Sequence, residues 1–148
     1  MTLEMGQPFP GFAAKNQDGE TLNLADYQSG KKLVVFFYPK ATTRGCVRET
    51  TEFAERRAEF DAVNTLLVGI SVDEVELQKE HAVQCHVNFP VLCDDDKALT
   101  TELGILSERG TAKRTTYLLD PSGVVQQVFN DVQVDGHVDQ VLEAVKGL

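Results

Sequence analysis

Two stretches of the chain are almost entirely apolar and rich in β-branched and aromatic residues. They cover residues 33–38 and 65–72. Continuous apolar runs of this length are typical of central strands that are buried on both faces. Pro39 follows the first run. It suits the end of a strand because proline has no N–H to offer a sheet. We therefore predict two core strands.

Other segments show apolar residues at helical spacing or polar groups that suit a helix start. Phe53, Ala54 and Phe60 form one face of a segment after Cys46, and the C-terminal segment repeats a single apolar stripe. Ser71 and Glu74 match a capping box, and Asp94–Asp96 supply carboxylates for another helix start. The predicted helices cover residues 47–60, about 72–85, 97–103 and 138–146.

Shorter apolar segments are separated by residues that favour turns. A tight turn over 16–20 is expected to join strands near 12–15 and 21–24, and residues 89–92 are expected to be extended. Residues 115–119 and 124–129 flank Asp120-Pro121-Ser122-Gly123. Proline second and glycine fourth suit a type I turn, which predicts a hairpin.

Strands that alternate with helices and end in a hairpin indicate an α/β fold. We expect a mixed central sheet flanked by helices on both faces. In such sheets, reactive groups gather at the carboxyl ends of the parallel strands. Cys46 follows the first core strand and therefore falls in that region.

Composition limits the kinds of protein this chain can be. With 148 residues, 42% of them hydrophobic, the chain is expected to fold as a single domain over 1–148. A net charge of −9 argues against nucleic acid and anionic membranes as partners. The N-terminus lacks a basic segment followed by an apolar one, and no apolar run could span a bilayer. Three cysteines without C-x-x-C spacing indicate free thiols and a cytoplasmic location.

Cys46 has a sequence context that favours a reactive thiol. It lies at or just before the first turn of a predicted helix, immediately after a buried strand. Free backbone N–H groups and the positive end of the helix dipole stabilise a thiolate at such a place. Arg44, two residues away, adds a nearby cation. The alternative is a small buried hydrophobe, the usual role of a lone cysteine.

The residues around Cys46 resemble a known signature. Pro39-x-x-x-Thr43-x-x-Cys46 is similar to the active-site motif of the peroxiredoxins, and the segments that begin at Phe36 and Arg114 resemble the bacterioferritin comigratory protein (PrxQ) branch. The resemblance covers nearly the whole chain. It implies a thioredoxin-like fold and thiol-dependent reduction of hydroperoxides. Its other motifs are Gly6-x-Pro8-x-Pro10-x-Phe12, Phe89-Pro90-Val91-Leu92 and Gly136-His137.

The resemblance also implies roles for individual residues. Cys46 would attack the peroxide and become a sulfenic acid. Thr43 would direct its hydroxyl at the peroxide, although it could instead cap the helix. Arg114 would place a permanent cation beside the thiol, whereas without the motif it would read as a surface charge. Pro39 would end the strand and shield the sulfur. Glu49 fits an acidic position of the family, but a helix dipole would explain it equally well.

The chain departs from the branch in ways that leave the second thiol open. Arg44-Gly45-Cys46-Val47 replaces the usual Pro-Gly-Cys-Thr, and Thr51 stands where many relatives carry the resolving cysteine. Cys85 is the first candidate for that role, one helical turn past the alternative family position at Ala82. Cys93 is the second candidate, and an external thiol is the third possibility.

The implied partners are a hydroperoxide substrate and thioredoxin or a similar dithiol reductant, with a monomer expected. No metal, haem or flavin is expected. His81 and Cys85 are four residues apart and His86 and Cys93 are nearby, but no second closely spaced pair completes a zinc site. An alternative function is a redox sensor that uses the same cysteine with little turnover.

Overall fold

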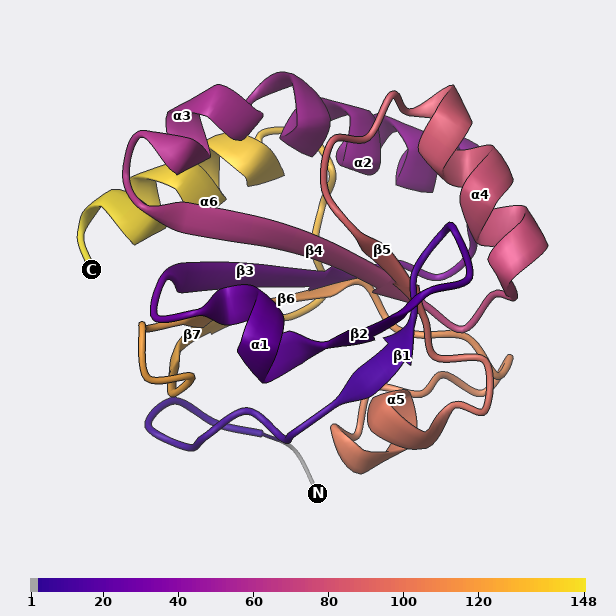
Figure 1. The fold of residues 1–148 in the computed structure, drawn as a ribbon, viewed down its shortest axis with the longest axis horizontal. Helices are drawn as coiled ribbons and strands as arrows, with labels where there is room; N and C mark the ends of the chain where they lie inside the picture. Colours follow the sequence, from indigo (N-terminus) through magenta and orange to yellow (C-terminus); the bar gives the residue numbers. More distant parts are fainter. Residues whose placement is uncertain (1–2) are drawn as a thin grey trace.

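The computed structural model describes residues 3–148, and its centre is a seven-stranded mixed sheet (Figure 1). The strand order is β2-β1-β5-β4-β3-β6-β7. The middle strands β5, β4 and β3 are parallel, and β6 and β7 continue the sheet in antiparallel pairing. The strands are β1 Ala13–Lys15, β2 Thr21–Asn23, β3 Lys32–Phe37, β4 Thr65–Ser71, β5 Val91–Cys93, β6 Thr115–Leu119 and β7 Val125–Phe129.

Helices cover both faces of this sheet. Figure 1 shows α2, α3, α4 and α6 on one face and α1 and α5 on the other. This arrangement confirms the predicted mixed sheet with helices on both faces. The helices are α1 Leu24–Gln28, α2 Arg44–Glu55, α3 Arg57–Asp61, α4 Val75–Gln84, α5 Ala98–Glu102 and α6 His137–Lys146. None of those within residues 3–148 is both long and apolar enough to cross a membrane.

Strand β3 separates two apolar cores, as its continuous hydrophobic run predicts. Val34, Phe36 and Tyr38 point into the core beneath α2, α4 and α6. Leu33, Val35 and Phe37 alternate with them and enter the core on the α1 and α5 side. Successive strand side chains face opposite sides of the sheet, so a strand apolar at every position must be covered twice.

The pairing of β3 with β6 positions the residues at one edge of the sheet. The strands are antiparallel, with Phe37 opposite Thr115. The end of β3 therefore lies beside the beginning of β6. Arg114, the residue before β6, is thereby placed next to the loop that leads from β3 into α2.

The helix predicted over 47–60 differs in two ways. Helix α2 begins three residues earlier, at Arg44, and the helical run is interrupted at Arg56 before α3. The short helix α1 was not predicted, because its five residues are too few to show a periodicity. Asn23 caps it by accepting the N–H groups of Ala25 and Asp26.

The capping box predicted at Ser71 is wrong. Ser71 is the last residue of β4, its hydroxyl donates to Asp73 Oδ2 (2.7 Å), and α4 begins only at Val75. A carboxylate does accept N–H groups at the start of the next helix, as predicted. Asp94 accepts those of Leu99 (3.2 Å) and Thr100 (2.7 Å).

The predicted hairpin is confirmed, and its turn is closed by the N–H of Gly123 donating to Asp120 O (2.9 Å). The extended piece predicted over 89–92 is shifted, since β5 covers Val91–Cys93.

Gly69 in β4 lies in a tightly packed part of the core beneath α2. A Cβ at this position would lie 2.9 Å from Phe36 Cζ and 3.1 Å from both Tyr38 Cε1 and Val91 Cγ1. We expect Gly69→Ala to lower the free energy of unfolding by about 1–3 kcal/mol, because the extra methyl overpacks a core of aromatic rings. Urea unfolding measures the change. Gly11→Ala is the control, since no atom lies within 4 Å of its Cβ position. A Gly69→Ala protein as stable as the control would contradict this packing.

Candidate active site

Cys46 lies in the first turn of α2, as the sequence predicts. It is the third residue of the helix, and its side chain is buried. Thr43 occupies the N-cap position with extended backbone, but its side chain makes no capping hydrogen bond. The N–H groups of the first helical turn have no partners within the helix, so they favour an anion at this end.

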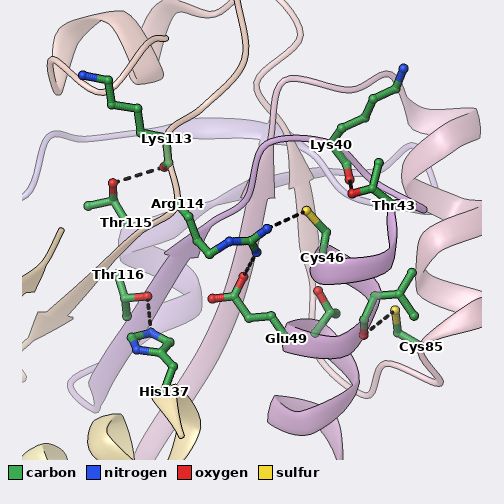
Figure 2. Close-up of polar contacts among 12 residues, drawn as sticks. Lys40, Thr43, Cys46, Glu49, Cys85, Lys113, Arg114, Thr115, Thr116 and His137 are labelled. Carbon is green, nitrogen blue, oxygen red and sulfur yellow. Dashed lines mark hydrogen bonds and ion pairs between the residues drawn. The ribbon is translucent and has the colours of Figure 1, made fainter. Parts of the chain in front are cut away.

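Arg114 meets the sulfur of Cys46 from the other side of the site (Figure 2). Its Nη2 donates to Cys46 Sγ at 3.4 Å, and its Nη1 donates to Glu49 Oε1 at 2.6 Å. Gly45 permits this approach, since a Cβ there would lie 3.3 Å from Arg114 Nη2. The guanidinium is thus held between a carboxylate and a thiol that belong to the same helix.

Glu49 has a different environment from the one the sequence indicates. Because α2 begins at Arg44, Glu49 lies in the second helical turn, where a dipole contributes less than in the first. It is fully buried, and its Oε2 has no hydrogen-bond partner among the described residues. Burial raises the pKa of Glu49 to about 7, and the charge of Arg114 opposes that rise. Its spacing from Phe53, one helical turn away on the buried face, is a sequence signal that could have indicated this burial.

The Thr43 hydroxyl donates to Lys40 O (2.6 Å) instead of capping α2, so the capping alternative is wrong. The hydroxyl oxygen retains lone pairs, and the side chain is exposed at the mouth of the site. Pro39 is half-buried and follows the end of β3, as expected. The proposed roles of Thr43 toward peroxide and of Pro39 in shielding the sulfur stay predictions.

Two side chains from the segment after β4 hold the loop between β3 and α2. Asp73 Oδ2 accepts the N–H of Ala41 (2.7 Å), and His81 Nδ1 accepts the N–H of Thr42 (2.8 Å). His81 Nε2 also contacts Thr50 Oγ1 at 2.9 Å. Both ring nitrogens of His81 are therefore used inside the protein. Within residues 3–148, no three His, Cys, Asp or Glu side chains are grouped so as to hold a metal ion.

The two other cysteines are free and buried, but their surroundings differ. Cys85 follows α4, and its Sγ donates to Val47 O at 3.6 Å (Figure 2), which places it against the residue after Cys46. Burial raises its pKa. Cys93 pairs with Lys15 across β5 and β1 and lines a hollow to which no described residue of α2 contributes. Burial, with nearby acidic groups, raises the pKa of Cys93 to about 12.

The arrangement suits nucleophilic chemistry at sulfur. A cation and a helix N-terminus both stabilise a thiolate at Cys46. The same two groups can stabilise negative charge that develops on a substrate oxygen beside the sulfur. The sequence indicated Cys46, and the family resemblance indicated Arg114 and an acidic residue at Glu49. The burial of Glu49 and the loop contacts of Asp73 and His81 were not predicted.

Comparisons with known proteins find relatives over nearly the whole chain. Residues 5–128 match the AhpC/TSA family. The chain is 32% identical to peroxiredoxin Bcp of Escherichia coli K12, over 97% of this chain and 96% of that protein. It is similar to the crystal structure of peroxidoxin BcpB from Mycobacterium tuberculosis (TM-score 0.93, 29% identity, 99% and 98% coverage). It also resembles the bacterioferritin comigratory protein of Xanthomonas campestris (TM-score 0.88, 29% identity, 97% and 98% coverage).

The buried carboxyl of Glu49 predicts a distinctive pH dependence of stability. Its pKa in the folded protein, about 7, exceeds its ordinary value of 4.5. The folded state therefore holds a proton that the unfolded state has released, and stability is lost as pH rises from about 4.5 through 7. We expect wild type to lose up to about 3 kcal/mol relative to Glu49→Gln over this interval.

Urea unfolding at pH 5 and pH 8 measures this difference. Glu52→Gln, which removes a half-buried carboxylate from the same helix, is the matched control and should show no comparable change. If the free energies of unfolding of wild type and Glu49→Gln differ by the same amount at pH 5 and pH 8, the Glu49 carboxyl titrates normally and this prediction is wrong.

Proposed function

The chain belongs to the AhpC/TSA family of peroxiredoxins, and on that premise we propose that it reduces hydroperoxides through a sulfenic acid at Cys46. The observation that carries the proposal is the contact of Arg114 with the Cys46 sulfur, with Glu49 holding the guanidinium from behind. The thioredoxin-like fold and peroxiredoxin activity are those of the family. The roles of the individual residues are the proposal.

The first step is an attack by the Cys46 thiolate on one peroxide oxygen. The sulfur–oxygen bond forms as the oxygen–oxygen bond breaks, leaving a sulfenic acid on Cys46 and releasing water or an alcohol. Negative charge develops on the departing oxygen. Arg114 and the free N–H groups of the first turn of α2 would stabilise that charge. The exposed Thr43 hydroxyl, which keeps lone pairs while it donates to Lys40 O, would orient the peroxide by accepting a hydrogen bond from it.

The substrates we propose are hydrogen peroxide and small organic hydroperoxides. The Xanthomonas campestris relative is described as reducing alkyl peroxides, which supports the second class. The site is reached from the loop at the end of β3, where Lys40, Thr43 and Arg44 are exposed.

We assign the resolving role to Cys85. Its sulfur already contacts the backbone of Val47, next in the chain to Cys46. Cys93 is a poorer candidate, because its raised pKa leaves almost no thiolate at neutral pH and the hollow it lines is formed mainly by β1, residues 94–96 and α5. Disulfide formation still requires the start of α2 to open, since the two Cα atoms must come within about 4.4–6.8 Å.

A dithiol protein such as thioredoxin would then reduce the Cys46–Cys85 disulfide. Both cysteines that this protein would contribute to the cycle belong to one chain, so a monomer is sufficient. A reducing compartment such as the cytoplasm suits a protein whose three cysteines are free.

Turnover of peroxide with thioredoxin, thioredoxin reductase and NADPH tests this cycle. We expect Cys46→Ser to abolish NADPH consumption because it removes the nucleophile. Cys85→Ser should lose thioredoxin-dependent turnover but still oxidise Cys46 once. Cys93→Ser is the matched control, and its turnover should stay within about twofold of wild type. Non-reducing peptide mapping should detect the Cys46–Cys85 disulfide in wild type and in Cys93→Ser.

Two outcomes would redirect the proposal. Turnover that only Cys46→Ser abolishes would mean that an external thiol reduces the sulfenic acid directly. Rapid oxidation of Cys46 in wild type without sustained turnover would favour a peroxide sensor over a peroxidase.

A further inference from the structure

His81 lies at the centre of the contacts between the Cys46 loop, α2 and Cys85. It is fully buried in α4 and stacks on the Tyr38 ring, with ring centroids 4.9 Å apart. Its nitrogens contact Thr42 in the loop and Thr50 in α2. The peroxidase step described above does not use it.

The hydrogen bonds of His81 determine which of its two ring nitrogens carries the hydrogen. The N–H of Thr42 can only donate, so Nδ1 must present its lone pair, and the ring hydrogen is on Nε2, donated to Thr50 Oγ1. Burial lowers the pKa of His81 to about 4, opposed by the charge of Asp73. The ring is therefore neutral at physiological pH, with its only lone pair engaged by the loop.

The loop that His81 holds has a strained backbone. Thr42 has φ +67°, in the left-handed region that β-branched residues avoid. The strain is balanced by the bond to His81 and by the neighbouring bond from Ala41 to Asp73. Breaking these two bonds both frees the loop and relaxes Thr42.

Cys85 lies against the same ring. Its Sγ is 3.7 Å from His81 Nε2 and 3.9 Å from Nδ1. A sulfur almost equidistant from both nitrogens is not in line with the lone pair on Nδ1, and its proton is directed at Val47 O instead. In the closed structure the thiol lies beside the imidazole but does not donate its proton to Nδ1.

We infer that His81 is the proton acceptor for Cys85 and that it becomes available only when the Cys46 loop opens. This inference rests on the proposed role of Cys85 as the resolving cysteine. Departure of the Thr42 N–H frees the lone pair of Nδ1, and opening of the start of α2 removes Val47 O from Cys85, so the thiol can turn its proton to Nδ1, 3.9 Å away. One event therefore releases the sulfenic acid and supplies the base that activates the thiol meant to attack it.

The step is balanced in atoms and charge. Cys85 transfers its proton to Nδ1, and the thiolate forms a bond to the Cys46 sulfur as the sulfur–oxygen bond of the sulfenic acid breaks. The departing hydroxide takes the proton from the imidazolium and leaves as water. The peroxide has already supplied the oxidising equivalents.

Other groups around His81 do not replace it. Tyr38, the residue after β3, has a pKa raised by burial, and its hydroxyl donates to Gln78 Oε1 (2.6 Å). Asp73, before α4, accepts from Ala41 and Ser71. From α2, Thr50 is neutral, and Cys46 carries the sulfenic acid that is under attack.

The test separates the two chemical steps by rapid mixing with one equivalent of hydrogen peroxide, acid quenching and mass spectrometry. His81→Asn keeps an amide oxygen for the Thr42 N–H but cannot take up a proton at neutral pH. We expect Cys46 oxidation within about twofold of wild type, and disulfide formation slowed at least about tenfold at pH 7.5.

The pH profile distinguishes a base from a merely structural residue. In wild type, the disulfide rate should be nearly constant between about pH 5 and pH 8, because a His81 ring with a pKa of about 4 is already neutral throughout that interval. In His81→Asn it should continue to rise beyond about pH 8 as the thiol itself ionises. His86→Asn is the matched control, at an exposed position with φ +53°, which asparagine tolerates. It should behave as wild type.

Disulfide formation in His81→Asn at the wild-type rate, with the wild-type pH profile, would overturn this inference alone. If His81→Asn fails to fold, the wild-type profile decides, and a rate that climbs steadily past pH 8 would overturn it. A wild type that oxidises Cys46 but never bonds it to Cys85 would overturn the resolving role and this inference together.

Discussion

The guanidinium of Arg114 and the sulfur of Cys46 are 68 residues apart in the chain, yet they are in contact across the end of the sheet. Antiparallel pairing of β3 with β6 brings them together, because the register that sets Phe37 opposite Thr115 delivers Arg114 to the loop leaving β3. Glu49 fixes the guanidinium from behind, and Gly45 leaves it room. A change of one residue in that register would turn the strand's side chains to the opposite face.

The proposed cycle needs the site to be closed for one reaction and open for the next. Attack on peroxide needs a fixed thiolate beside a fixed cation, which the buried contacts of α2 provide. Joining Cys46 to Cys85 needs the same segment to separate from its supports. A strained Thr42 held by side-chain acceptors from the β4–α4 side reconciles the two needs, since a few hydrogen bonds keep the loop closed and their loss relaxes it.

Much of this organisation could be predicted from local patterns. The apolar run of β3 indicated a strand covered on both faces, and the strand-to-helix junction indicated a reactive Cys46. Arg114 emerged only from the resemblance to a family motif, because no local pattern separates it from its basic neighbours. Glu49, Asp73 and His81 act through contacts between segments distant in the chain, so their roles depend on tertiary packing. The capping box predicted at Ser71 was wrong for the same reason, because pairing with the neighbouring strands makes Ser71 the last residue of β4.

The central claim is that Arg114 activates Cys46 for attack on peroxide. The most direct measurement is the stopped-flow rate constant for oxidation of Cys46 by hydrogen peroxide, in a single turnover without reductant. Arg114→Gln removes the charge at similar length, and the account predicts a fall of about 100-fold or more, with Arg114→Lys in between. A folded Arg114→Gln protein that oxidises Cys46 within about threefold of wild type would contradict it.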